Sequence, residues 1–303
     1  MRDSIPYLTG DGILKPLTVL SLFDGLSCGQ IALARAGITV KQYFASEIDK
    51  HAIKVTQSRH PDTIQLGDIL DLDVSILPEI DLLIGGSPCQ SFSVAGDGTG
   101  FDGKSKLFWE FVRILKELKP KYFLLENVKM KSSWRDIITK TVGVEPIEIN
   151  SALVSGQHRR RYYWTNIPGN TQPKDQEISL SDVLEVISDN EDVTYGDRLA
   201  PNGKTVRVEA TDFPYTFYEA RTDEGKAERR RLRKLLGRDT TPRGAKYKIY
   251  LPLRHLKSNC TELERLQTLP VGYTEGISPT QRRKAIGNGW TVDVIAHIFL
   301  GIK

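Results

Sequence analysis

Short apolar runs, each followed by a helical pattern, fill the first 165 residues and constrain the fold most strongly. Runs such as Leu17–Phe23, Asp81–Ile84 and Tyr122–Leu125 are apolar without alternation. Strands that are apolar on both faces are typical of a parallel sheet covered by helices on both sides. The sequence therefore predicts a doubly wound α/β domain. Its other expected elements are a strand at Lys41–Ser46 and helices at Gly29–Ala36, Asp49–Arg59 and Leu107–Leu118.

The pattern changes after about Gly169, where the chain becomes polar and rich in turns. Thr171–Ala220 holds 4 basic and 11 acidic residues, whereas Arg221–Lys257 holds 13 basic and 4 acidic ones. A basic block in a chain whose net charge is only +4 indicates a surface that faces a polyanion, and a solvated helix face is the alternative. We predict a first domain at 1–169, an inserted lobe at 170–257 and a segment at 258–303 that returns to the first domain.

Several classes of protein do not fit the composition. No apolar run approaches the roughly 18 residues that a membrane span needs. The first 15 residues carry Asp3 and Asp11 and no apolar core, so we expect no secretory signal. The three cysteines, Cys28, Cys89 and Cys260, follow no paired spacing, which argues against a disulfide framework and a zinc ribbon. We expect a cytoplasmic protein with reduced thiols, no bound metal and no membrane partner.

Glycines and carboxylates follow the expected strands, where doubly wound sheets bind ligands. The turn Phe23–Gly29 lets the backbone approach a ligand at a helix N-terminus. Glu47 ends the second strand, where a carboxylate can accept hydrogen bonds from a ribose, and Asp68 with Ile69 ends the third. These residues predict a nucleoside-bearing cofactor. The first turn lacks the G-x-G-x-x-G pattern of a dinucleotide site.

A cysteine stands on the loop that follows the strand Asp81–Ile84. Pro88 and two preceding glycines present Cys89 at the end of that strand, where its thiolate can act as a nucleophile. A small buried apolar side chain is the alternative reading of a free cysteine. The following segment, Ser93–Gly103, is rich in glycine and is a candidate lid, or an ordinary connection.

Two further groups lie at the ends of later strands. Glu126 ends the strand that begins at Tyr122, and it is either a functional carboxyl group near Cys89 or a helix cap. Arg159 and Arg161 alternate, so on a strand both would point to one side. They would hold an anionic or carbonyl group over the site, or form surface ion pairs.

In their order and spacing, these motifs resemble the cytosine-C5 DNA methyltransferase family. The resemblance is to compact bacterial and phage members, with Arg59-His60 and Trp290 closer to the catalytic domain of the animal de novo enzymes. It implies a Rossmann-like sheet typical of S-adenosylmethionine-dependent methyltransferases, with a small inserted target-recognition lobe. The motifs are Phe23-x-Gly25, Glu47, Gly67-Asp68, Pro88-Cys89-Gln90, Glu126-Asn127-Val128, Gln157-x-Arg159-x-Arg161, Glu262–Gln267 and Gly287–Val292.

The resemblance implies S-adenosylmethionine as the cofactor. Ser27-Cys28 and Trp290 replace smaller residues that are common in bacterial members, which would tighten the pocket. The residues expected to bind the cofactor are Phe23, Asp24, Gly25, Leu26, Ser27, Cys28, Glu47, Ile48, Asp68, Ile69, Pro88, Leu107, Asn288, Gly289, Trp290 and Val292.

The resemblance also implies a reaction on a cytosine that is flipped out of double-stranded DNA. Cys89 would attack carbon 6, Glu126 would act at N3, and Arg159 and Arg161 would hold the base carbonyl and the cysteine loop. Alternatives are an RNA cytosine-C5 methyltransferase, an inactive DNA-binding relative, and a nicotinamide-dependent dehydrogenase, which would not explain Cys89 with Glu126. The residues expected to contact a short DNA target are Gln90, Ser91, Ser93, Arg229, Arg230, Arg231, Arg233, Lys234 and Arg243.

Overall fold

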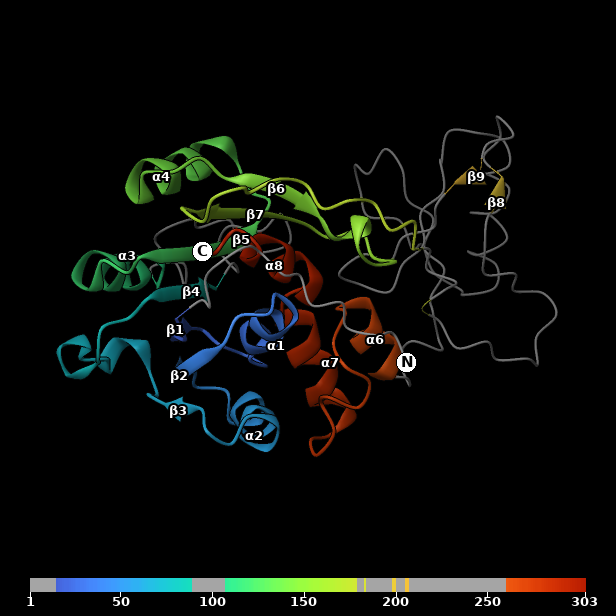
Figure 1. Cartoon of the computed structure of the whole chain (residues 1–303). Helices are drawn as coiled ribbons and strands as arrows, with labels where there is room; N and C mark the ends of the chain where they lie inside the picture. Colours follow the sequence, from blue (N-terminus) through green and yellow to red (C-terminus); the bar gives the residue numbers. More distant parts are fainter. Residues whose placement is uncertain (1–14, 89–106, 179–182, 184–197, 200–204, 207–259) are drawn as a thin grey trace. The chain divides into compact units, whose positions relative to one another are not determined.

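The structure is a computed structural model, and it describes residues 15–88, 107–178, 183, 198–199, 205–206 and 260–303 (Figure 1). The chain divides into two compact units. The first comprises Met1–Ile149, Arg160–Pro173 and Tyr273–Lys303, and the second comprises Asn150–Arg159 and Lys174–Gly272. The predicted boundaries at 169 and 257 stay a prediction, because most of the lobe lies outside the described residues.

The first unit contains a sheet and the helices that flank it. Its described elements are β1 (Leu17–Leu22), α1 (Cys28–Arg35), β2 (Val40–Ser46), α2 (Lys50–Arg59), β3 (Ile64–Gln65), η1 (Ile69–Asp71), η2 (Val74–Ile76), β4 (Leu82–Gly86), α3 (Leu107–Leu118), β5 (Tyr122–Val128), α4 (Ser132–Val142), β6 (Ile147–Asn150), β7 (Arg160–Thr165), α7 (Pro279–Asn288) and α8 (Val292–Phe299). The second unit contains η5 (Ser151–Leu153), α6 (Cys260–Leu266) and the paired strands β8 (Arg198–Leu199) and β9 (Thr205–Val206). None of the described helices has the length and apolar character needed to cross a bilayer.

The sheet has seven strands in the order β3-β2-β1-β4-β5-β7-β6. Strands β1 to β5 pair in parallel, as the continuous apolar runs predict, and the doubly wound prediction is confirmed. Strand β7 differs, because it runs antiparallel to β5 with Glu126 opposite Tyr163. In the chain, β7 follows β6, which is also its other neighbour in the sheet. Two neighbouring strands can run parallel only if a crossover of about a dozen residues or more joins them, and the segment between β6 and β7 is shorter than that.

The core lies on both faces of the sheet. All six residues of β1 are buried. On one face, Phe108 and Phe111 of α3 pack in a cluster with Leu20 and Leu22 of β1. Helices α1 and α8 lie together on the other face, away from α3 (Figure 1). This layering brings the carboxyl ends of β1, β2, β4 and β5 to one edge, where the predicted site residues follow.

Replacing Phe111 by alanine tests the importance of the α3 face. Phe111 is fully buried, so Phe111→Ala should lower the free energy of unfolding by roughly 3–5 kcal/mol. Lys116→Ala on the exposed side of the same helix should change it by less than about 0.5 kcal/mol. Chemical unfolding of both variants is the measurement. Equal destabilisation by the two substitutions would contradict this packing.

Candidate active site

The turn between β1 and α1 has an unusual backbone. Phe23, Gly25 and Ser27 have φ angles of 58°, 57° and 54°, in the left-handed region. Glycine adopts this region readily, but each of the two other residues pays roughly 1–3 kcal/mol of strain for it. Such a conformation persists only where surrounding groups hold it, so the contacts of this turn show how the site is built.

Glu47 holds the turn through its carboxylate. Its Oε2 accepts a hydrogen bond from the Gly25 N–H at 2.7 Å, and its Oε1 accepts from the N–H groups of Ile48 and Asp49 at 2.8 Å each. Oε1 already accepts two hydrogen bonds, whereas Oε2 accepts one and keeps a second lone pair, which leaves room for a ribose hydroxyl. The residue predicted to bind ribose therefore also fixes the neighbouring turn.

Asp24 turns its carboxyl group back into the protein. It accepts hydrogen bonds from the Tyr43 hydroxyl at 2.9 Å and from the Ser27 hydroxyl. The residue as a whole is half-buried, but loss of hydration at its carboxyl group raises its pKa from 3.8 to about 6. The hydrogen bonds act in the opposite direction and do not offset that effect.

Tyr273, which no local sequence pattern indicates as a site residue, supports the same turn. Its hydroxyl donates to the Leu26 carbonyl at 2.8 Å and lies 3.1 Å from His60 Nε2. Because a hydroxyl carries one proton, His60 must be the donor to Tyr273. Arg59 Nε donates to the Tyr273 carbonyl at 2.8 Å. The Arg59-His60 pair that resembles the animal enzymes thus acts through Tyr273.

Exposed apolar side chains lie next to the carboxylates that follow β2 and β3, those of Glu47 and Asp68. Ile48 is 71% exposed and Leu70 is 57% exposed, which is unusual for large aliphatic residues. Asp68 Oδ1 accepts from the Leu70 N–H at 3.0 Å and caps η1. The Ile69 side chain lies in the core, so only its backbone faces this region. An apolar surface beside carboxylates can accommodate a flat heterocycle.

The Glu126 carboxylate lies between two donors. Arg161 Nε is 3.1 Å from Oε1, and Trp290 Nε1 donates to Oε2 at 3.1 Å. A methyl group on Gly86 would come within 2.9 Å of both the Glu126 and Trp290 side chains, so glycine makes this approach possible. Glu126 and Arg161, each predicted to be a site residue, thus form an ion pair in the structure.

Asn127 links this carboxylate to the strand end that precedes Cys89. Its Nδ2 donates to the Ser87 hydroxyl at 3.0 Å, and its Oδ1 accepts from the Val128 N–H at 2.8 Å. Asn127 is almost completely buried. The first residues of the cysteine loop are therefore anchored to β5.

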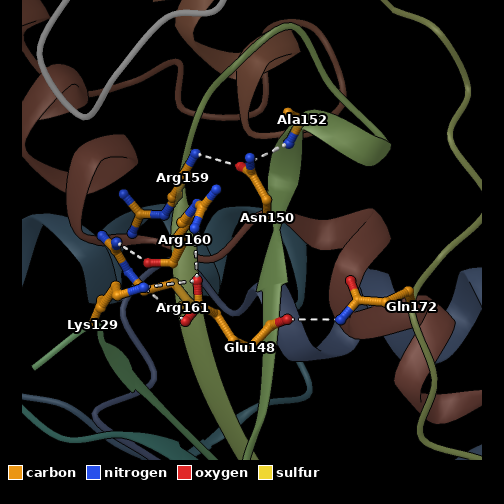
Figure 2. A network of polar contacts seen from close by, with 8 residues as sticks. All are labelled: Lys129, Glu148, Asn150, Ala152, Arg159, Arg160, Arg161 and Gln172. Carbon is orange, nitrogen blue, oxygen red and sulfur yellow. Dashed lines mark hydrogen bonds and ion pairs between the residues drawn. The ribbon is translucent and has the colours of Figure 1, made fainter. Parts of the chain in front are cut away.

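The remaining predicted residues fall into three groups. Pro88 follows β4, Leu107 begins α3, Asn288 ends α7, and Val292 begins α8, while Gly289 packs near the buried Cys28. Arg159 belongs to the second unit, where its N–H donates to Asn150 Oδ1 at 3.0 Å (Figure 2). The predictions that lie outside the described residues concern Cys89, Gln90, Ser91, Ser93, the loop to Gly103, the helix 224–236, Arg229, Arg230, Arg231, Arg233, Lys234 and Arg243.

Known proteins resemble this chain in sequence. Residues 17–141 match the family described as C-5 cytosine-specific DNA methylase. The orphan methyltransferase M.SPRI of Bacillus phage SPR is 47% identical over 116 residues, which are 37% of this chain and 26% of that protein. The type II methyltransferase M.NlaX of Neisseria lactamica is 29% identical over 303 residues, 92% of this chain and 94% of that protein. The match thus spans about a quarter of the phage relatives and nearly all of the Neisseria relative.

Solved structures share the fold. A protein described as a DNA modification methyltransferase encoded within an E. coli prophage has a TM-score of 0.59 at 20% identity, covering 94% of this chain and 98% of that chain. A DNMT2 variant of Spodoptera frugiperda also has a TM-score of 0.59, at 19% identity, covering 95% and 100%. The seven-strand order is that of the S-adenosylmethionine-dependent methyltransferase fold.

The pKa of Asp24 gives a prediction for stability. Its folded-state value of about 6 lies above the ordinary 3.8, so the folded protein holds this proton more tightly. The Asp24 contribution to stability is therefore lost as the pH rises from about 4 to about 6. Relative to wild type, the free energy of unfolding of Asp24→Asn should increase over that range, by up to about 3 kcal/mol.

Urea unfolding at a series of pH values measures this difference. Asp73→Asn is the matched control: hydrogen bonds from Ser75 lower the pKa of Asp73 below 3.8, so its difference from wild type should stay nearly constant from pH 4 to pH 7. A difference between Asp24→Asn and wild type that stays constant from pH 4 to pH 7 would rule out a raised Asp24 pKa.

Proposed function

We propose that the chain belongs to the C-5 cytosine-specific DNA methyltransferase family and that it transfers a methyl group from S-adenosylmethionine to carbon 5 of cytosine in double-stranded DNA. The observation that carries the proposal is the Glu126 carboxylate, held by Arg161 and Trp290 at the sheet edge from which the Pro88-Cys89 segment leaves. The left-handed turn at Phe23–Ser27 lies at the same edge.

The residues at this edge fit a nucleoside cofactor. Glu47 provides carboxylate oxygens for the ribose, and the exposed Ile48 provides an apolar surface for the adenine. Gly25, which has no side chain, lets the main chain of the left-handed turn come close to the methionine part. When bound, S-adenosylmethionine supplies an electrophilic methyl group on a positively charged sulfur.

The reaction needs a nucleophile and a group that acts on the pyrimidine ring. The Cys89 thiolate forms a bond to carbon 6, which breaks the aromaticity of the ring and places electron density on carbon 5. Glu126, carrying a proton, donates it in a hydrogen bond to N3 and so stabilises the negative charge that develops there. Carbon 5 then takes the methyl group, a base removes its proton, and the electrons of that C–H bond expel Cys89.

The contacts of Glu126 orient it for this role. Its two oxygens bind Arg161 and Trp290, which fix the plane of the carboxyl group and leave one lone pair on each oxygen, so that one oxygen can carry the proton shared with N3. Arg161 compensates the negative charge of this buried group. We propose that Arg159 holds the base carbonyl, and that the basic residues of the lobe contact the DNA.

The substrate must leave the duplex to reach these groups. A stacked cytosine does not expose its ring faces, so the base is flipped out at a cost of a few kcal/mol. Relatives from Bacillus phages and Neisseria support a role in DNA modification within the cytoplasm of a bacterial or phage-infected cell, in restriction–modification or in phage anti-restriction. The target sequence would be short, since the lobe is small.

Methyl transfer to unmethylated plasmid from labelled S-adenosylmethionine tests the proposal. Wild type should place the label in 5-methylcytosine, and Cys89→Ser should abolish transfer while cofactor binding persists, because the thiolate is lost. Glu126→Gln should lower the rate by about 10²–10⁴-fold.

RNA of matched length is the comparison substrate. Label in RNA alone would favour the RNA methyltransferase alternative. Binding of DNA and cofactor without any transfer by wild type would favour an inactive relative.

The Tyr273 contact predicts an effect on the cofactor. Tyr273→Phe removes the hydrogen bond to the Leu26 carbonyl and loosens the turn, so the Kd of S-adenosylmethionine should rise about 2–10-fold. At saturating cofactor, kcat should stay within about twofold, because Tyr273 touches no reacting group. Calorimetry measures the affinity.

Tyr122→Phe is the matched control. The Tyr122 hydroxyl also donates to a main-chain carbonyl, that of Lys303 at 2.7 Å, but it lies at the opposite end of β5 from Glu126. An equal loss of affinity in both variants would mean that Tyr273 acts only through overall stability.

A further inference from the structure

Lys129, Glu148 and Arg160 form an ion-pair cluster beside the candidate active site. Lys129 directly follows β5, and Arg160 begins the antiparallel β7, so both lie at the strand ends that carry Glu126 and Arg161. Glu148 of β6 joins them: its carboxylate is 3.0 Å from Lys129 Nζ and 3.2 Å from Arg160 Nη1 (Figure 2). All three residues belong to the first unit.

The cluster differs from the Glu126–Arg161 pair in its access to solvent. The side chains of Lys129 and Arg160 are 53% and 49% exposed, whereas those of Arg161 and Glu126 are 10% and 11% exposed. Exposed ion pairs are weak, because water screens them and long side chains lose freedom when they pair. Lys129 and Arg160 can therefore exchange Glu148 for another anion.

Strand alternation gives the two neighbouring arginines different tasks. Arg161 points to the face where Glu126 lies, and Arg160, one residue earlier, points to the other face. Arg161 is engaged by the buried carboxylate, and Arg160 is available at the rim. The cluster thus lies at the same edge of the sheet as Glu126, but on the opposite face.

Glu148 is fixed while its partners are long and flexible. Its main-chain carbonyl accepts a hydrogen bond from Gln172 Nε2 at 2.7 Å, which ties β6 at this point (Figure 2). Lys129 and Arg160 both pair with the Glu148 carboxylate, so the cluster has a net charge of one positive unit and can attract an anion. A phosphate suits this arrangement, because a guanidinium binds it through paired N–H groups and an ammonium as a point charge.

We propose that Lys129 and Arg160 bind the DNA phosphate backbone next to the flipped cytosine, exchanging the Glu148 carboxylate for phosphate oxygens. The inference rests on the proposed function, since a target base that reaches Glu126 brings its flanking phosphates to this edge. The contacts position the DNA without reading its sequence. Glu148 holds both cations ready and weakens their attraction for other polyanions.

Salt dependence of binding to a short labelled duplex tests the proposal, with the full-length protein and fluorescence anisotropy as the readout. Each phosphate contact contributes about 0.9 to the slope of log K against log salt concentration. The double variant Lys129→Gln/Arg160→Gln should lower the magnitude of that slope by about 1 to 2. Glu148→Gln should bind the duplex more tightly than wild type, because a competing charge is lost.

The control variant Lys41→Gln/Lys116→Gln removes two exposed charges elsewhere on the first unit and should leave the slope unchanged. The proposal is overturned if Lys129→Gln/Arg160→Gln has the wild-type slope, if the control lowers the slope equally, or if Glu148→Gln binds more weakly. A change of slope with RNA alone also overturns it. Failure of wild type to bind duplex DNA would instead contradict the proposed function.

Discussion

The Glu126 carboxylate connects three distant parts of the chain. It lies in β5 and binds Arg161 of β7 and Trp290, which is 164 residues further along. A buried ion pair adds little net stability, but removing one partner leaves an uncompensated charge and is strongly destabilising. The carboxylate that we propose acts on the base therefore also fixes how β4, β5, β7 and the segment around Trp290 meet. The absence of a side chain at Gly86 follows from the same requirement.

The turn after β1 shows how a strained backbone is maintained. Glu47 binds the Gly25 amide, Tyr273 binds the Leu26 carbonyl, and the Asp24 carboxyl group binds Tyr43. These partners come from β2, from the end of β2 and from a segment near the C-terminus. Strain at a ligand site is therefore balanced by contacts distributed over the unit, and preorganisation of this kind reduces the ordering that ligand binding would otherwise require.

The sequence predicted what depends on local pattern. Strands such as Leu17–Leu22 were predicted to within one or two residues, because a short continuous apolar run is typical of a buried strand. Helix Leu107–Leu118 was predicted from its apolar residues at helical spacing. Glu126 and Arg161 were each predicted to be site residues, but the ion pair between them was not predicted. Reversal of β7 was not predicted, since nothing in its residues encodes direction. Tyr273 was missed because its partner Leu26 is 247 residues away, and no local pattern signals such a contact.

The order in which the chain is synthesised determines when the contacts of the turn and of Glu126 are complete. The first 150 residues supply most of the sheet, but Tyr273 and Trp290 leave the ribosome more than a hundred residues later. Until then, the turn lacks one support and Glu126 lacks one donor. A chain that stopped before these residues would contain Glu126 without Trp290, and the turn without Tyr273. Orientation of these groups therefore depends on the segment that contains Tyr273 and Trp290 as much as on the first 150 residues.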